Sequence, residues 1–533
     1  MSANVTPTDT ISVTSSPSRV LARNTAWNYI GFTFNLAANF VLFPYVVHRL
    51  GDAAAGIWLL LGSVTGYMGL LELGIVPSLT QWIAAASARD ERDGVNRAAS
   101  SAQALLIVLG LMALLVLPAA GPASRALGIP AELSAQAMTA FQITLLGFVL
   151  RMPLATYQGV LLGRQRQDRC NQLWIAIAGA KFIGAAVVLA NGGGLVTLVA
   201  TEMTVHLLAG VLQIRWVYEE LPTLSIALRH VHRADAARLL SFGGTLMLVN
   251  VCSLVIEQTD RLVIATFLPI REVTYYAAAW KLYMLAYTIT TTLVQAVSPF
   301  AAALHGRQDR AALRELVLTM TKFSGALAWP LSLGLAFAGG PFLKVWMGDR
   351  FVAALPVVQV LAGSFIVTAF NHAAYAALVG TRRVSPLVAS YFVPQAALNL
   401  LLSVWLVHRF GNIGVALGTL VPAVVLQPIY IRFVLRELEL PARVFLTRAV
   451  QPVSLPALLF APLIAAYVAL GPAAPVLPLI AIVCAAAYAF LVWRGTDARE
   501  RADLLAYAPA PVRRWLGPLD LAPEPIGAEE VRP

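Results

Sequence analysis

The stretch VIEQTDRLVIATFL, residues 255–268, places Glu257, Asp260 and Arg261 inside an otherwise apolar run. On a helix with about 100° between residues, these three fall with Asn250 and Ser253 within about 100° of one face. Three charges exposed to hydrocarbon would cost about 8–10 kcal/mol. The stretch therefore predicts a membrane-spanning helix whose polar face is turned toward a cleft between two halves of the protein or lies near the outer interface.

The composition extends this interpretation to the whole chain. Of the 533 residues, 59% are hydrophobic and 12% are charged, whereas an average soluble domain has about 25% charged residues. We expect an integral membrane protein with no separate soluble domain. The polar N-terminal segment, residues 1–23, lacks the short apolar core of a secretory signal, so the first span itself is expected to direct insertion.

The fold class that we predict is an all-α polytopic membrane protein. A window of about 19 residues finds about fourteen apolar segments long enough to cross a bilayer as helices. They lie at 25–47, 56–78, 99–120, 136–160, 172–190, 194–214, 241–268, 275–302, 318–339, 356–379, 386–407, 413–433, 451–470 and 475–493.

The Lys and Arg residues predict the orientation of these segments. With the N-terminus inside, 27 of the 38 fall on the inner side and 7 on the outer side, and four lie within spans. Positive residues concentrate on the cytoplasmic side of membrane proteins, so both termini are expected to be cytoplasmic. This topology accounts for the net charge of +11, and no nucleic-acid partner is expected.

An internal repeat divides the predicted spans. VPSLTQWIAAASARD after the second span parallels VSPFAAALHGRQDR after the eighth, and YQGVLLGRQRQ after the fourth parallels YAALVGTRRV after the tenth, at offsets of 222 and 217 positions. An even number of spans per half predicts a parallel repeat about an axis along the membrane normal. The predicted parts are a cytoplasmic tail (1–23), a six-helix bundle (24–215), an amphipathic linker (216–240), a second six-helix bundle (241–435), an accessory helix pair (436–493) and a cytoplasmic tail (494–533).

Several of these sequences resemble a known family. The run VVHRLGDAAAGIWLLLGSVTGYMGLLELGIVPSLTQWIA, the Gly163–Arg164 corner, and QTDRLVIATFL followed by EVTYYAAAWKL are similar to the polysaccharide transporters of the multidrug/oligosaccharidyl-lipid/polysaccharide exporter superfamily. The resemblance covers nearly all of residues 20–493. It implies a bacterial inner-membrane flippase that moves an oligosaccharide linked to undecaprenyl diphosphate from the cytoplasmic to the periplasmic leaflet, with membrane lipid, a polysaccharide polymerase and chain-length machinery as partners.

Such a cargo calls for amides, aromatic rings and a few cations in a cavity. Asn28, Asn35 and Asn39 share one face of the first span with Asn24, and they predict either a cavity lining or interhelical hydrogen bonds. Arg151 and Lys181 lie deep in their spans, where a charge costs about 2.5–3.5 kcal/mol. They are candidate ligands for a phosphate or an acidic sugar, or else structural partners of Glu72 and Glu202.

The carboxylates are candidates for ion coupling. Glu257 and Arg261 stand one turn apart and can pair, which would leave Asp260 as the carboxylate that binds a proton or sodium ion; the alternative is a self-neutralised cluster. The resemblance directs attention to Asp260, because an acidic residue followed by a basic one recurs at this span in the family. Glu202 and Glu72 are the other candidates.

Other functions fit the sequence less well. Cys170, Cys252 and Cys484 are far apart and form no metal-ligand spacing, and no catalytic or phosphate-binding motif is present, so neither an enzyme nor a cofactor is expected. A polysaccharide polymerase or ligase would be expected to carry a long extracytoplasmic loop, and the predicted outer connections are short. The main alternative is a cation-coupled exporter of small drugs from the same superfamily.

Overall fold

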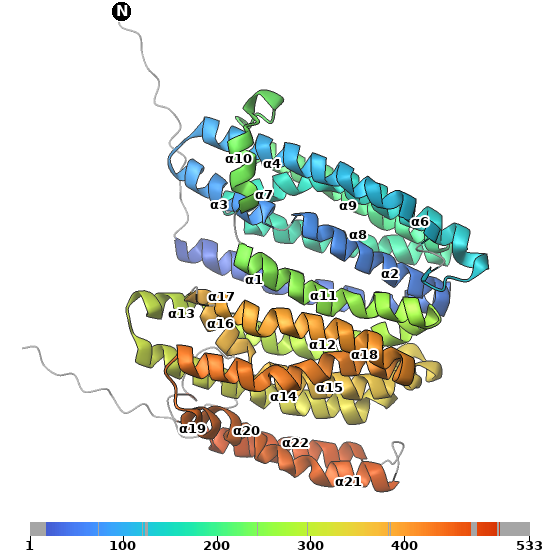
Figure 1. Ribbon diagram of the computed structural model, residues 1–533, viewed down its shortest axis with the longest axis vertical. Helices are drawn as coiled ribbons and strands as arrows, with labels where there is room; N and C mark the ends of the chain where they lie inside the picture. The colour runs from blue at the N-terminus through green and yellow to red at the C-terminus, as the bar shows by residue number, and fades with distance from the viewer. Residues whose placement is uncertain are drawn as a thin grey trace, which may run out of the picture. The chain divides into compact units, whose positions relative to one another are not determined.

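The computed structural model describes residues 17–500 except 73, 120, 123–125, 242–243, 296, 382, 384, 471–476 and 498–499. The described residues form helices and the turns that join them, and this part of the chain contains no strand (Figure 1). They divide into two compact units. Unit 1 comprises the described residues up to Ala278 together with Ala396–Gly418, and unit 2 comprises Ala279–Gln395 and the described residues from Thr419 onward.

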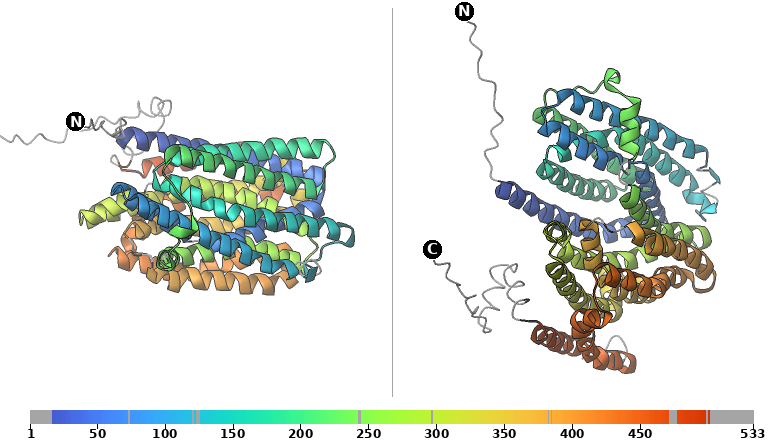
Figure 2. Two further views of the ribbon diagram at one scale, coloured as in Figure 1. Left: turned by 90° about the horizontal axis from the view of Figure 1, so that it is seen from above. Right: turned by 60° about the vertical axis from the view of Figure 1, so that its left-hand side comes forward.

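Unit 1 is a bundle of long helices joined by short ones. In chain order its elements are α1 (Pro17–Leu50), α2 (Asp52–Met68), η1 (Gly69–Glu72), α3 (Ile75–Ala88), α4 (Arg92–Ala113), η2 (Leu114–Ala119), α6 (Ala131–Arg151), η3 (Met152–Leu154), α7 (Ala155–Gly163), α8 (Gln167–Ala190), α9 (Leu195–Glu220), η4 (Leu228–His230), α10 (Arg233–Ser241), α11 (Gly244–Phe267) and the start of α12 (Arg271–Val294). Helix α8 packs against α1 and α9, α6 packs against α9, and α11 packs against α2. Figures 1 and 2 show α4, α6, α8 and α9 running side by side.

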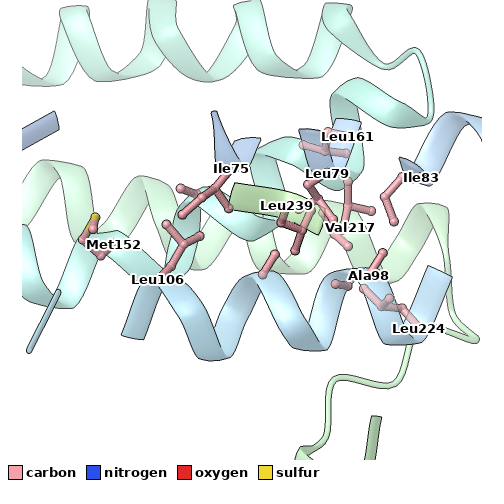
Figure 3. Close-up of a cluster of buried hydrophobic side chains, with 14 of the residues drawn as sticks. Ile75, Leu79, Ile83, Ala98, Leu106, Met152, Leu161, Val217, Leu224 and Leu239 are labelled. Carbon is pink, nitrogen blue, oxygen red and sulfur yellow. The ribbon is translucent and has the colours of Figure 1, made fainter. Parts of the chain in front are cut away.

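A large apolar cluster of unit 1 lies around α3, α4 and α7. Leu79, Ile83 and Leu106 are fully buried there, and Figure 3 shows them facing Val217 and Leu239 from later helices. Small residues let the backbones approach closely: a Cβ on Gly163 of α7 would lie 2.9 Å from the carbonyl oxygen of Thr80. This packing holds α3, α4 and α7 together at this end of the bundle.

Unit 2 contains the remaining helices. These are the rest of α12, α13 (Val297–Gly306), α14 (Arg310–Met347), η5 (Asp349–Ala354), α15 (Leu355–Ala369), α16 (His372–Gly380), α17 (Ser385–Leu387), the π-helix η6 (Val388–Phe392), the ends of α18 (Val393–Glu437), α19 (Ala442–Phe445), the π-helix η7 (Leu446–Val450), α20 (Gln451–Ser454), η8 (Pro456–Phe460), α21 (Ala461–Leu470) and α22 (Leu477–Arg494). Helix α14 packs against α15, α13 and α16. Within α18 the backbone of Gly411 has a φ of 56°, which marks a kink between two helices.

Eight helices among the described residues are long and apolar enough to cross a membrane. They coincide with nine of the predicted segments, because Ser385–Glu437 covers two of them. Helix α11 is not one of the eight. Every 18-residue stretch of it contains three charged residues, Glu257, Asp260 and Arg261, which is more charge than an apolar span is expected to carry. The chain is thus a multi-pass membrane protein, and the count of fourteen spans stays a prediction.

One local arrangement occurs in both units, at the positions where the sequence repeats. In unit 1, Gly163 at the end of α7 packs on α3, which contains Pro77. In unit 2, Gly380 at the end of α16 packs on α13, which contains Pro299, and a Cβ on Gly380 would overlap the carbonyl oxygen of Ser298. The symmetry of the whole halves remains a prediction.

The C-terminal helices pack on α14. Phe460, Tyr488 and Val453 form a buried cluster with Trp329 and Phe337. Lys322 of α14 is only 3% exposed. Its Nζ donates hydrogen bonds to the Gly495 carbonyl (2.7 Å) and to Glu500 Oε2 (2.8 Å). The ammonium group of Lys322 is therefore satisfied by groups within the protein.

Candidate functional site

A polar cavity of about 300 Å³ lies inside unit 1. Its walls come from α1, η1, the break between α6 and α7, α8 and α9. The polar and aromatic side chains that line it are Asn35, Glu72, Arg151, Gln158, Trp174, His206 and Gln213. Apolar residues complete the walls, and the cavity therefore offers one cation, several amides and an indole ring in an otherwise apolar bundle.

Helix breaks position the central ion pair. Helix α6 ends at Arg151 because Pro153 removes a main-chain donor. Helix α2 passes into the 3-10 turn that ends at Glu72, and Gly74, with a φ of 92°, starts α3. Arg151 Nη2 lies 3.7 Å from Glu72 Oε1, and the two side chains are 35% and 25% exposed. Both members of the pair thus stand where a regular α-helix is interrupted.

A second ion pair connects three helices beside the cavity. Lys181 Nζ of α8 lies 3.4 Å from Glu202 Oε1 of α9, and Glu202 is only 10% exposed. Trp58 of α2 donates its indole N–H to Glu202 Oε2 at 3.1 Å. His206, one turn after Glu202, lines the cavity. The two deep cations of the first bundle are therefore each paired with the carboxylate that the sequence offered as a structural partner, and Arg151 also lines the cavity.

The asparagines on one face of α1 differ in what they contact. Asn35 lines the cavity. Asn39 Nδ2 donates to both the main-chain oxygen and Oδ1 of Asn35 at 2.8 Å, so it orients the amide of Asn35. Asn28 lies outside the residues whose side chains the structure describes.

Asp260 and Arg261 of the polar stripe of α11 contact other helices of unit 1. Asp260 is 1% exposed; Oδ2 accepts a hydrogen bond from the hydroxyl of Tyr276, and Oδ1 accepts one from Ser403 Oγ at 3.5 Å. Next to it, Thr259 shares a hydrogen bond with Tyr67 of α2. The carboxylate accepts hydrogen bonds from hydroxyl groups of α12 and α18, an arrangement that suits either protonation state.

The expected pairing within this stripe is wrong. No ion pair within 4 Å joins Glu257 to Arg261 in the part of the chain that the structure describes. Arg261 Nη1 instead donates to Ser63 Oγ of α2 and to Gln258 Oε1, both at 3.2 Å, while Glu257 is exposed. Hydroxyl groups therefore satisfy Asp260, and a hydroxyl and an amide satisfy Arg261, as polar groups inside a protein require.

Sequence reasoning missed Gln158, Trp174 and Gln213 as cavity residues. Helical spacing contained a signal for two of them. Gln158 lies seven residues after Arg151, and Gln213 lies eleven residues after Glu202, so each falls within about 20° of a residue already considered. Trp174 has no such partner, and an isolated tryptophan in an apolar span is equally typical of lipid contact.

A bundle of membrane helices that encloses a polar, charge-bearing cavity is the architecture of a membrane transporter. The comparisons agree. The family model described as "Polysaccharide biosynthesis protein" matches residues 84–356, and the chain belongs to this family.

Two curated relatives and one solved structure extend this assignment. The uncharacterized membrane protein EpsK of Bacillus subtilis is 23% identical, over 79% of this chain and 87% of that protein. A putative O-antigen transporter of Shigella flexneri is 20% identical, over 77% of this chain and 98% of that protein. The inward-facing structure of a multidrug resistance MATE family transporter of the MOP superfamily aligns with a TM-score of 0.65 at 16% identity, over 79% of this chain and 98% of that chain. The chain therefore has the fold of these transporters.

Proposed function

We propose that this protein is a flippase that moves a polyprenyl-diphosphate-linked oligosaccharide from the cytoplasmic to the periplasmic leaflet of a bacterial inner membrane by alternating access. The cavity of unit 1 carries the proposal. Its amides from Asn35, Gln158 and Gln213 suit sugar hydroxyls, the ring of Trp174 suits a sugar face, and Arg151 suits a phosphate. The relative described as an O-antigen transporter supports a glycan cargo.

The ion pairs give the transporter groups that can exchange partners. When the diphosphate enters, Arg151 would leave Glu72 for the phosphate oxygens, since a guanidinium binds phosphate in a bidentate geometry. Glu72 would then be a buried carboxylate without its cation, and such a group takes up a proton readily. We infer that uptake of a proton by Glu72, Glu202 or Asp260 resets the cycle.

A deletion strain tests the cargo. Cells that lack the protein are expected to accumulate undecaprenyl-linked oligosaccharide, and the wild-type gene is expected to clear it. Drug sensitivity without this accumulation would instead assign the chain to small-molecule export, the function that the names of MATE structures describe for those proteins. Both lipid-linked glycan and drug uptake are measured in the same strains.

Complementation with a matched set of variants tests the cavity. Arg151→Ala is expected to reduce export severalfold at unchanged abundance, and Arg151→Lys to keep part of it. The Arg151→Ala/Glu72→Ala variant removes both charges of the pair, so a merely structural pair would be relieved and export would recover. Continued low export in this double variant supports phosphate binding by Arg151. Lys344→Ala, which breaks an exposed pair with Asp349, is the control.

A further inference from the structure

A second cavity, apart from the one described above, lies in unit 2 along α18 and α19. It has a volume of about 900 Å³, at the upper end of the range for ligand pockets. Its walls are apolar side chains of α15, α18, α19 and η7, among them Val424, Pro428, Ile431 and Leu435. We call this feature the α18 groove; Figure 1 shows α18 leading to α19.

Two arginines stand at one end of the α18 groove. Arg432 and Arg436 are spaced one helical turn apart, so they project from the same face of α18. The third polar residue of the lining, Gln427, exchanges two hydrogen bonds with the amide of Asn371, at 2.8 and 3.0 Å. The groove therefore offers two guanidinium groups and an apolar wall, without the set of amides that a sugar would need.

The neighbouring arginines are engaged elsewhere. Arg383 pairs with Glu437, Arg310 and Arg314 pair with Glu439, and Arg448 pairs with Glu315. Neither Arg432 nor Arg436 has an ion pair in the described part of the chain, and both are exposed. The acidic residues around this end of α18 are thus used by arginines outside the groove, and the two inside it keep their charge available for an anion.

The dimensions of the groove match one leaflet of a membrane. From Val424 to Arg436 the helix rises about 18 Å at 1.5 Å per residue, slightly more than half of the roughly 30 Å hydrocarbon core. Arg432 lies at the end of the predicted span 413–433 and Arg436 just after it, on its predicted cytoplasmic side. Basic pockets between helices on that side suit anionic head groups.

We propose that the α18 groove binds one anionic phospholipid of the cytoplasmic leaflet. Its phosphate contacts Arg432 and Arg436, and an acyl chain lies against Val424, Pro428 and Ile431. This site gives the first of the accessory helices a role, because Phe445 of α19 and Leu446 of η7 form the opposite wall.

Lipid binding to the full-length purified protein tests this proposal. Phosphatidylglycerol or phosphatidylcholine is titrated into detergent solution, and bound lipid is counted by native mass spectrometry. The wild type is expected to bind one phosphatidylglycerol more tightly than phosphatidylcholine. Arg432→Gln/Arg436→Gln is expected to weaken phosphatidylglycerol binding roughly 5- to 30-fold, and Arg432→Lys/Arg436→Lys to preserve most of it. The control Arg233→Gln/Arg307→Gln removes the same charge from two exposed arginines outside the groove.

Three further arms separate the sources of the anion. Leu435→Trp fills the groove and leaves both arginines, so it is expected to weaken binding as well; unchanged binding would overturn the proposal by showing that surface charge alone attracts lipid. Equal loss in the control variant would overturn it too. If glycerol phosphate binds as tightly as the lipid, the groove is a site for a free phosphate. If undecaprenyl diphosphate displaces phosphatidylglycerol only in protein with both arginines, the groove is a site for the cargo. Thermal melts and gel filtration establish that each variant is folded.

Discussion

At the residue scale, the deep charges of unit 1 that could be placed beside the cavity or in α11 have nearby partners. Arg151 and Lys181 pair with Glu72 and Glu202, and Asp260 is held by the hydroxyl of Tyr276. These partners differ in kind. The two cations have carboxylates that a competing phosphate can replace, whereas Asp260 is almost fully buried among hydroxyl donors. The first arrangement suits a cargo site, and the second suits a proton site.

Asp260→Asn tests the proton site. Asparagine has the same shape and can still accept from Tyr276, so we expect the free energy of unfolding to change by no more than about 1 kcal/mol. Export should slow and lose its dependence on pH, because the amide takes up no proton. Tyr276→Phe, which removes only the donor, should retain a pH dependence with a changed midpoint. Export by Asp260→Asn that follows the wild-type pH profile would make Asp260 a structural residue.

At the element scale, close glycine contacts fix the short helices against their neighbours. Gly163 of α7 and Gly380 of α16 each lie against the backbone and side chains of a helix that contains a repeated sequence motif, α3 and α13 respectively. A Cβ added to either glycine would overlap these neighbouring atoms. Elsewhere, as at Gly334 of α14, nothing lies within 4 Å of an added Cβ.

Gly380→Ala and Gly334→Ala form a matched pair within unit 2. Alanine at Gly380 would meet the carbonyl oxygen of Ser298, so the variant should unfold at a lower temperature, with a loss of about 1–3 kcal/mol. Alanine at Gly334 should be neutral or raise stability by about 0.5–1 kcal/mol, since alanine favours a helix. Equal melting temperatures for both variants in detergent would contradict the close packing of α16 on α13.

The Lys322–Glu500 pair ties the end of the described chain to α14. Removing one partner leaves a buried charge, so Glu500→Gln should cost about 3–5 kcal/mol. Lys322→Met/Glu500→Gln removes both charges and should recover most of that loss. Chemical unfolding or thermal melts measure the series. A double variant as unstable as the single one would show that the pair is not what holds this segment.

At the scale of the whole molecule, apolar composition was sufficient to predict a helical membrane protein. The hydropathy averaged over a window of residues measures how favourably a segment lies in lipid. The same average placed a segment at 241–268, within a few residues of α11, in spite of the charges that this helix contains. It located the break inside α18 to within a few residues, since Gly411 and the polar residues around it interrupt the apolar run.

The candidate site was only partly predictable, and the reason is physical. Deep charges such as Arg151 stand out because their burial is costly, so they are found without a structure. Partners depend on which helices touch: the sequence offered Glu257 as the partner of Arg261, but α2 supplies Ser63 instead. Uncharged cavity residues such as Gln158 and Trp174 cost little in a membrane helix, and their sequence signal is weak.

The repeated sequence motifs predict a symmetry of the complete fold. Residues 20–215 and 240–433 should superpose by a rotation of nearly 180° about the membrane normal, as offsets of 217 and 222 residues in a parallel repeat require. An experimental structure in lipid measures this directly. Halves that match only by an axis in the membrane plane would contradict a parallel repeat.

The central claim is that the protein moves a lipid-linked oligosaccharide across the membrane, and the sidedness of that glycan tests it most directly. Intact spheroplasts are treated with a membrane-impermeant reagent that modifies sugars, and the modified fraction of the lipid-linked pool is measured by mass spectrometry. With the wild-type protein most of the pool should be accessible from outside, and in cells without it, or with Arg151→Ala/Lys181→Ala, the pool should be protected. An equally accessible pool in the deletion strain would contradict the proposed function.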